Sequence, residues 1–331
     1  MPAVVSRASG PAWPGLVVDL GGTNVRFALV DGPEAPLHDI EKYSGDDYDS
    51  FDDALKTYLQ KVGVRPRALA VAVAGPIEDG DTITVTNRDH WVISASGLAR
   101  RHDLDRVVLL NDFEAMVRVL PALKPDETIA LGGDRPERDH TMVLMGPGTG
   151  LGVATLVCGP RGWIVVSGEG GHVDMAPGTE REDAAFDLLR RELGRVSAET
   201  VLSGPGLVNL YRALAALDGE KPALHDAPDI TAAALGGGDA RAREAVDIFC
   251  ALTGAYAGDL ALIVGARGGV YLGGGILPRL ADIIADTPLR ARFEAKAPMQ
   301  DFVRPIPVRL ITAAFPGLAG AALWLADIQE R

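Results

Sequence analysis

The sequence has few cysteines and no cysteine motif of the kind that holds a metal or a disulfide framework. Its two cysteines, Cys158 and Cys250, lie among apolar residues and form no CxxC or other metal-ligand spacing. The pattern favours two buried thiols over a disulfide between them, because buried free cysteines behave as small apolar side chains. We therefore expect no fold that depends on zinc or on disulfides.

The sequence also lacks an excess of basic charge. Its 32 lysines and arginines are outnumbered by 45 aspartates and glutamates, which gives a formal net charge of −13. An acidic surface repels nucleic acid and anionic membranes, so neither is expected as a partner. A phosphate group would then have to be bound locally, and backbone N–H groups are the most suitable donors for it.

No targeting or membrane-spanning pattern is found. The N-terminus has no cationic stretch followed by an apolar one, as a secretory signal would have. No apolar run approaches the ~20 residues that a spanning helix needs. The sequence therefore predicts a cytoplasmic protein, and we expect Met1–Pro14 to be a flexible lead-in.

Length and composition predict two domains. A chain of 331 residues, with 47% hydrophobic and 23% charged residues, is long enough and apolar enough for two cores. Strand-like runs alternate with helix-like ones, which indicates an α/β fold. We expect a smaller α/β domain over residues 15–122 with the C-terminal segment 313–331 packed back on it, and a larger α/β domain over residues 123–312.

Three glycine-rich turns each follow a predicted strand. The first is Gly21-Gly22-Thr23 after Leu16–Leu20, the second is Gly146–Gly152 after Met142–Met145, and the third is Gly273–Gly275. Glycine lets backbone N–H groups approach a polyphosphate closely, and Thr23 and Thr149 add hydroxyl donors. Because the first two strand–turn–strand units lie about 125 residues apart, they also suggest an internal duplication of the fold.

The alternative is that these segments are ordinary hairpin turns, and their order and number argue against it. The sequence contains no GxxxxGK[ST] motif, so it is not a P-loop protein, and it contains no strict GxGxxG, which weakens a dinucleotide-binding interpretation.

Two carboxylates stand at strand ends. Asp19 precedes the first glycine pair, where it is suited to hold Mg²⁺ through water, although a turn-forming aspartate is the alternative. Asn111 and Asp112 separate the strand Val107–Leu110 from a helical pattern. A kinase that acts on a hydroxyl needs such a carboxylate to accept the proton, and the amide of Asn111 can orient the acceptor; helix capping explains either residue equally well.

Glu169 and His172 flank two glycines and could grip adjacent hydroxyls of a polyol. A single histidine is more often structural, but here the glycines expose both side chains. Glu199, in contrast, has the pattern of an ordinary surface residue.

The ordered set of motifs resembles the bacterial glucokinase family, in the branch typified by the enterobacterial enzyme. The resemblance covers nearly the whole chain from about Gly15 onward and rests on these segments: Asp19-Leu20-Gly21-Gly22-Thr23-Asn24, Leu110-Asn111-Asp112-Phe113, Gly148-Thr149-Gly150-Leu151-Gly152, Gly168-Glu169-Gly170-Gly171-His172-Val173-Asp174, Ser197-Ala198-Glu199, Ser203-Gly204-Pro205-Gly206-Leu207-Val208-Asn209-Leu210-Tyr211 and Gly273-Gly274-Gly275-Ile276. The cysteine-rich zinc motif of the ROK sugar kinases and repressors is missing.

The resemblance implies a two-domain, actin-like (ribonuclease-H-like) fold with a cleft, and ATP-dependent phosphorylation of glucose at its 6-hydroxyl with Asp112 as the base. Glucose would be bound by Asn87, Asn111, Asp112, Glu169, His172 and Glu199. Asp19 would serve Mg²⁺, and ATP would lie between the first two turns, with the third near the adenosine: Val18, Asp19, Leu20, Gly21, Gly22, Thr23, Gly148, Thr149, Gly150, Gly273, Gly274 and Gly275. The family also implies a homodimer.

One segment departs from the family pattern. Arg88-Asp89-His90-Trp91, which follows Asn87, carries one more residue than the pattern has. Other functions stay open at this point: a kinase for another hexose, a non-catalytic sugar sensor on the same fold, or an actin-like assembly ATPase. The last would leave Asn111, Asp112 and the pair Glu169 and His172 without a purpose.

Overall fold

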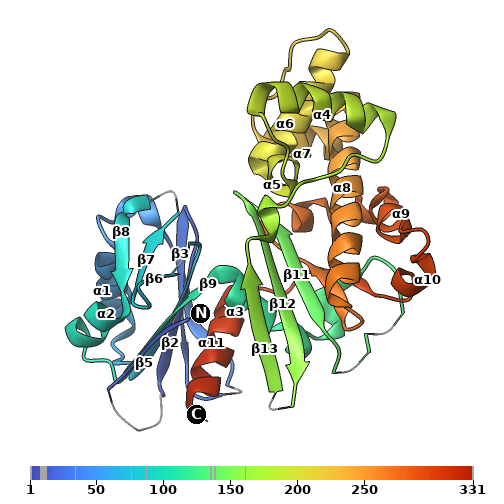
Figure 1. The fold of residues 1–331 in the computed structure, drawn as a ribbon. Helices are drawn as coiled ribbons and strands as arrows, with labels where there is room; N and C mark the ends of the chain where they lie inside the picture. Colours follow the sequence, from blue (N-terminus) through green and yellow to red (C-terminus); the bar gives the residue numbers. More distant parts are fainter. Residues whose placement is uncertain are drawn as a thin grey trace. The chain divides into compact units, whose positions relative to one another are not determined.

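In the computed structural model the chain divides into two compact α/β units (Figure 1). The first unit contains the residues up to Ala122 together with those from Ala314 onward, and the second unit is Leu123–Ala313. The structure describes residues 2–7, 13–33, 35–75, 77–86, 88–134, 136–137, 139–160 and 162–329.

The sheet of the first unit has three parallel strands at its centre. Its order is β1-β9-β5-β2-β3-β4, and the bounds are β1 Ala3–Ser6, β2 Gly15–Leu20, β3 Asn24–Val30, β4 His38–Ser44, β5 Ala68–Val73 and β9 Arg106–Asn111. Strands β2, β5 and β9 run parallel, whereas β3, β4 and β1 pair antiparallel to their neighbours. All six residues of β5 are buried because both faces of the sheet are covered.

Two pairs of helices cover this sheet. On one face lie α1 (Phe51–Val62) and α2 (Ala95–Arg101), which share a core with alternate residues of the strands. On the other face lie α3 (Asp112–Arg118) and α11 (Pro316–Gln329). A small sheet of β6 (Ile77–Glu78), β7 (Thr82–Val85) and β8 (Arg88–Ser94) follows β5 in the chain.

The second unit repeats the topology of the first. Its sheet order is β10-β15-β14-β11-β12-β13, with β10 Thr128–Ala130, β11 Met142–Pro147, β12 Leu151–Gly159, β13 Gly162–Gly168, β14 Gly269–Leu272 and β15 Val308–Ile311. Strands β11, β14 and β15 are parallel, while β12, β13 and β10 are antiparallel to their neighbours. Each strand thus has a counterpart of the same direction in the first unit, which confirms the predicted duplication.

The helices of the second unit are more numerous. They are α4 Glu180–Leu193, α5 Ala198–Val201, α6 Gly204–Leu217, α7 Ala227–Gly236, α8 Ala240–Val264, α9 Leu289–Glu294 and α10 Gln300–Val303. Single 3₁₀ turns complete the chain: η1 Gly45–Asp47, η2 Leu120–Ala122, η3 Pro125–Glu127, η4 Gly170–His172, η5 Leu277–Leu280 and η6 Ile284–Asp286.

Helix α8 corrects the expectation that no apolar run is long enough for a membrane. By length and composition it could cross one, and the sequence pattern missed this because Asp247 and Asp259 interrupt the apolar run. In the structure 78% of its most apolar window is buried, and Figure 1 shows it lying along the sheet of its unit, where it packs on β11 and β14. Helix α8 is therefore a core helix of the second unit.

Two further expectations are corrected. Residues Ala3–Ser6 are not part of a flexible lead-in, because they form β1 and pair with β9. Both cysteines are free, as predicted, but only Cys250 is buried, and burial raises the pKa of its thiol to about 12. Cys158 is half-buried, since it lies on β12 with one side of the strand open.

The C-terminal helix packs on the first unit, as predicted. Helix α11 contacts α3, β2 and β5. Trp324 Nε1 donates a hydrogen bond of 3.1 Å to the carbonyl of Glu114, and Arg118 pairs with Asp327. The approach is close at Gly320, where an added Cβ would lie 1.9 Å from the carbonyl oxygen of Ala115.

We therefore expect Gly320→Ala to force α11 away from α3 and to lower the unfolding free energy by about 1–3 kcal/mol, as overpacking does. Gly236→Ala is the matched control, because its Cβ would meet nothing within 4 Å and alanine favours a helix. Urea unfolding of both variants measures the difference. Equal stability of the two variants would contradict the close approach.

Candidate functional site

Three polar residues of the first unit gather at one edge of its sheet. Asp19 is the fifth residue of β2, Asn111 ends β9, and Asp112 begins α3. Strands β2, β5 and β9 are parallel and in register, with Asp19 opposite Ala72 and Ala72 opposite Leu110. Their carboxyl ends therefore meet at the same edge, which is where α/β sheets bind ligands.

Asn111, and not Asp112, caps helix α3. Its Oδ1 accepts a hydrogen bond of 2.9 Å from the N–H of Phe113, and Glu114 Oε2 lies 3.4 Å from the N–H of Asn111, completing a capping box. Asn111 Nδ2 lies 3.4 Å from the carbonyl of Gly75. Because the helix already has its cap, the Asp112 carboxylate is available for another role.

The Asp112 carboxyl group has an unusually high proton affinity. Burial, and then the negative charge of Asp19, raise its pKa to about 6, against the opposing effect of a 3.0 Å hydrogen bond from the N–H of Phe113. Burial also raises the pKa of Asp19, although Arg26 Nη1, 3.1 Å from its Oδ2, acts against the rise. Asp19 is therefore ion-paired with Arg26, whereas Asp112 has a pKa near neutrality.

The first glycine turn joins β2 to β3. Its carbonyls are held from within the unit: Arg88 Nε donates 2.9 Å to the carbonyl of Gly22, and the N–H of Gly45 donates 2.8 Å to that of Thr23. Thr23 is exposed. The side chains of Val18 and Leu20 are fully buried in the core, so these two residues can reach a ligand only through their backbone.

In the second unit the other two glycine turns lie side by side. The N–H of Gly275 donates 3.0 Å to the carbonyl of Pro147, and the N–H of Gly204, at the start of α6, donates 2.8 Å to that of Gly148. Glu199 Oε2 accepts 2.8 Å from the N–H of Leu151, just after the second turn. The interpretation of Glu199 as an ordinary surface residue is therefore wrong: its carboxylate is tied to the turn.

A cavity of about 620 Å³ opens beside these turns. Its lining joins both glycine turns, the start of α6 and the start of α7: Gly148, Thr149, Gly204, Pro205, Val208, Asn209, His225, Asp226, Ala227, Pro228, Thr231, Gly275, Ile276 and Arg279. Ser203 caps α6, accepting 2.9 Å from the N–H of Gly206, so the positive end of the helix dipole lies beside this cavity. Sequence reasoning missed His225, Asp226 and Arg279, which belong to no glycine motif.

Glu169 and His172 stand at the two ends of η4, and both are exposed. The glycines between them are needed for packing, since a Cβ on Gly171 would lie 2.3 Å from the carbonyl of Leu151. The turn η4 contacts α5, which carries Glu199, and the N–H of Ala198 donates 2.8 Å to the carbonyl of Val173. Glu169, His172 and Glu199 thus come from neighbouring elements.

Asn87 lies outside the described residues. Within the residues that the structure does describe, no group of three or more His, Cys, Asp or Glu could hold a metal ion by itself.

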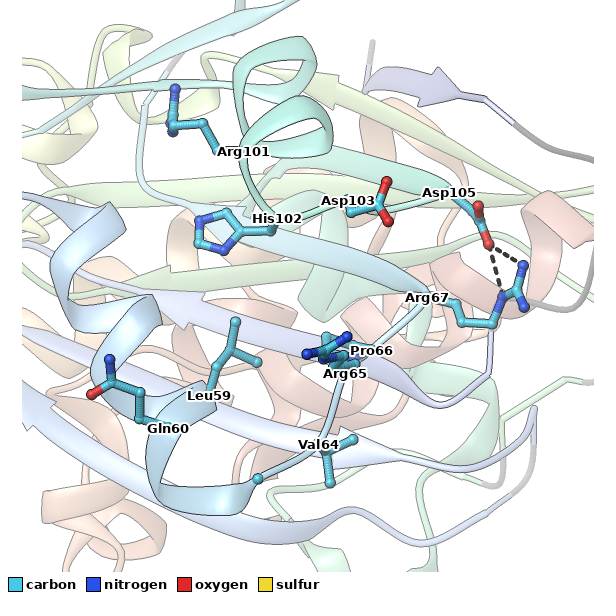
Figure 2. Close-up of a pocket in the computed structure, with 11 residues that line it drawn as sticks. Leu59, Gln60, Val64, Arg65, Pro66, Arg67, Arg101, His102, Asp103 and Asp105 are labelled. Atoms are coloured by element: carbon cyan, nitrogen blue, oxygen red, sulfur yellow. Dashed lines mark hydrogen bonds and ion pairs between the residues drawn. The ribbon is translucent and has the colours of Figure 1, made fainter.

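A cavity of about 670 Å³ in the first unit has a different character (Figure 2). It lies where β5 and β9 begin, at the edge opposite to Asp112, and none of the predicted site residues lines it. Its basic groups are largely paired, Arg67 with Asp105 as Figure 2 shows, and Arg101 and His102 with Asp52. Its position and pairing separate it from the candidate site.

Comparison with known proteins agrees with these features. Residues 16–328 match the family model described as Glucokinase. The chain is 47% identical over 317 residues to a glucokinase of Chromobacterium violaceum, covering 96% of this chain and 90% of that protein. It is 42% identical over 310 residues to a glucokinase of Yersinia pestis, covering 94% and 95%.

A solved structure has the same fold. The glucokinase from an Antarctic psychrotroph superposes with a TM-score of 0.85 at 34% identity, covering 95% of this chain and 98% of that one. The fold is the two-domain, actin-like ATPase fold of sugar kinases. Together with the family match over nearly its whole length, this shows that the chain belongs to the glucokinase family.

Proposed function

We propose that this enzyme transfers the γ-phosphoryl group of ATP to the 6-hydroxyl of glucose, giving glucose 6-phosphate and ADP, and that Asp112 is the general base. The observation that carries the proposal is the half-buried Asp112 carboxylate, which stands at the start of α3 near the charge of Asp19 and has its pKa raised to about 6. Such a group is ionised at neutral pH yet basic enough to take a proton.

In the proposed step a bond forms between the glucose 6-oxygen and the γ-phosphorus, and the bond from that phosphorus to the bridging oxygen of ADP breaks. The hydroxyl proton moves to the Asp112 carboxylate. Because the transition state of phosphoryl transfer is loose, the proton moves late, and positioning of the groups matters more than the strength of the base.

Glucose is proposed to be held by hydroxyl contacts from Asn87, Asn111, Glu169, His172 and Glu199, besides Asp112. A related sugar that leaves one such buried group unpaired loses ~1–3 kcal/mol of binding energy. Glu199 already accepts the N–H of Leu151, so it connects the sugar contacts to the second glycine turn.

ATP is proposed to place its phosphates at the first two turns and its adenosine in the 620 Å³ cavity beside Gly275. The residues involved are Val18, Asp19, Leu20, Gly21, Gly22, Thr23, Gly148, Thr149, Gly150, Gly273, Gly274 and Gly275. The start of α6, which borders the cavity, offers a positive dipole end to an anion.

Asp19 fits a magnesium ion that arrives with ATP. It is a carboxylate near that of Asp112 and is paired with Arg26, and Mg²⁺ is usually held by one or two carboxylates plus substrate phosphates. When bound, the ion neutralises charge on the phosphates. The domain assignment is proposed with it: residues 15–122 plus 313–331 carry Asp19 and Asp112, and residues 123–312 carry the adenosine and most sugar contacts.

The setting is proposed to be a cytoplasmic homodimer that binds neither nucleic acid nor membranes. The formal net charge of −13 supports the absence of nucleic-acid and membrane partners. A broader hexokinase and a non-catalytic sugar sensor are the alternative functions.

A coupled assay of ADP release with Mg·ATP and a panel of hexoses tests the proposal and its alternatives together. We expect release that depends on glucose and exceeds that with mannose or fructose. Equal rates with several hexoses would support the broader kinase, and a protein that binds glucose without releasing ADP would support the sensor.

Asp112→Asn should lower kcat by roughly 10²–10⁴-fold, because the amide cannot accept the proton. Glucose affinity should change little, since the amide has the same shape. Steady-state kinetics and calorimetric glucose titration measure the two effects. A variant with near-normal kcat would remove Asp112 from the role of base.

The pH dependence should report the same group. With a pKa of about 6, Asp112 is protonated and inactive below that pH and ionised above it, so kcat/KM should rise with pH and level off above about 7. Asp19→Asn removes the neighbouring negative charge and should move the inflection to lower pH. An inflection that stays in place in this variant would point to another titrating group.

Glu169→Ala and His172→Ala should mainly raise the KM for glucose, each by about tenfold for one lost hydrogen bond to a charged or polar group. The KM for ATP should stay within about twofold. Unchanged glucose KM in both variants would count against their role in sugar binding.

A further inference from the structure

The guanidinium group of Arg88 is buried against the first glycine turn. The residue is 8% exposed, and it begins β8. Its Nε donates 2.9 Å to the carbonyl of Gly22, and its Nη2 lies 2.5 Å from Asp46 Oδ1. Its Cζ lies 5.2 Å from the centre of the Trp91 ring, a cation–π distance.

An irregularity in the small sheet accommodates this arrangement. Thr84 pairs with Val92, but the next residue, Val85, pairs with Arg88. Three residues of β8 therefore bulge out of the ladder between Arg88 and Val92. Trp91, whose ring lies against the guanidinium, is one of the bulged residues.

Gly45 completes the contact from the other side. A Cβ at this position would lie 2.7 Å from Arg88 Cζ, so only glycine allows the guanidinium to lie there. The N–H of Gly45 itself holds the carbonyl of Thr23 at 2.8 Å. Two successive carbonyls of the turn are thus fixed: Arg88 holds that of Gly22, and Gly45 holds that of Thr23.

We propose that Arg88 is a positioning residue that orients the peptide between Gly22 and Thr23 for phosphate binding. In a trans peptide the C=O and the N–H point in opposite directions. Holding the Gly22 carbonyl toward Arg88 therefore directs the Thr23 N–H away from it, toward the exposed side of the turn. This inference rests on the proposed function, in which that turn binds the phosphates of ATP.

The chief rival is that Arg88 only stabilises the fold. The second unit offers a matched control in Arg290, whose Nη1 donates 2.9 Å to the carbonyl of Ile306. Its Nε lies 2.7 Å from Glu294 Oε1, and its Cζ lies 4.8 Å from the Phe293 ring centre. It makes the same three kinds of contact but touches no glycine turn of the candidate site.

The test compares Arg88→Lys with Arg290→Lys in the full chain, by calorimetric titration with Mg·ATP, adenosine and glucose separately. Lysine lacks the planar guanidinium group that lets arginine bind the Gly22 carbonyl and lie against the Trp91 ring at the same time. In Arg88→Lys we expect the Kd for Mg·ATP to rise about tenfold, with the Kd values for adenosine and glucose within about twofold of the parent values. Arg290→Lys should lower the melting temperature but leave all three unchanged.

Equal loss of Mg·ATP and adenosine binding in Arg88→Lys, or unchanged Mg·ATP binding, would overturn the inference. Gly45→Ala is the second variant if Arg88→Lys does not fold, because its methyl group pushes the guanidinium from the carbonyl while residue 88 stays arginine. Gly45→Ala should weaken the binding of Mg·ATP without weakening that of adenosine or glucose. Parent-like binding of Mg·ATP in this variant would also contradict the inference. Glucose-dependent ADP release by the parent protein is measured alongside; its absence would refute the proposed function instead.

Discussion

The structure of the first unit depends on keeping two carboxylates close together at one edge of a buried sheet. Asp19 and Asp112 lie at the ends of parallel strands that coincide, and the negative charge of Asp19 adds to burial in raising the pKa of Asp112. The ion pair with Arg26 acts against the rise in the pKa of Asp19, and the N–H of Phe113 acts against that of Asp112. The helix cap at Asn111 and the close packing of α11 on α3 hold this arrangement in place. Stabilising contacts elsewhere in the unit thus offset the unfavourable proximity of the two carboxylates.

One topology serves two kinds of chemistry. Both sheets have the same strand order and directions, and both have a glycine turn after the first central strand. In the first unit the adjoining strand ends carry carboxylates. In the second unit the corresponding region carries a cavity with apolar walls and a helix start. The strands position the groups in both units, and the segments that follow the strands decide which side chains and cavities lie there.

Local patterns in the sequence predicted what is local in the structure. The α/β class, the glycine turns, the Ser203 cap and the place of Asp112 at a strand–helix junction were all visible because each depends on adjacent residues. The contacts of Glu199 and Arg88 were not, since they join residues 48 and 66 positions apart. Strand β1 was missed because four residues give too short an alternation to read. Asn87 lies outside the described residues, so its part in the site stays a prediction.

The short strand β1 has a practical consequence for handling the protein. It occupies the outer side of β9, whose backbone would otherwise present a row of unpaired donors and acceptors at the edge of the sheet. Trimming the first seven residues for crystallisation, or fusing a bulky tag directly to them, would uncover a buried, apolar strand at the margin of the sheet. We expect self-association and loss of solubility as the result. A purification tag at the N-terminus should therefore be separated from Ala3 by a spacer.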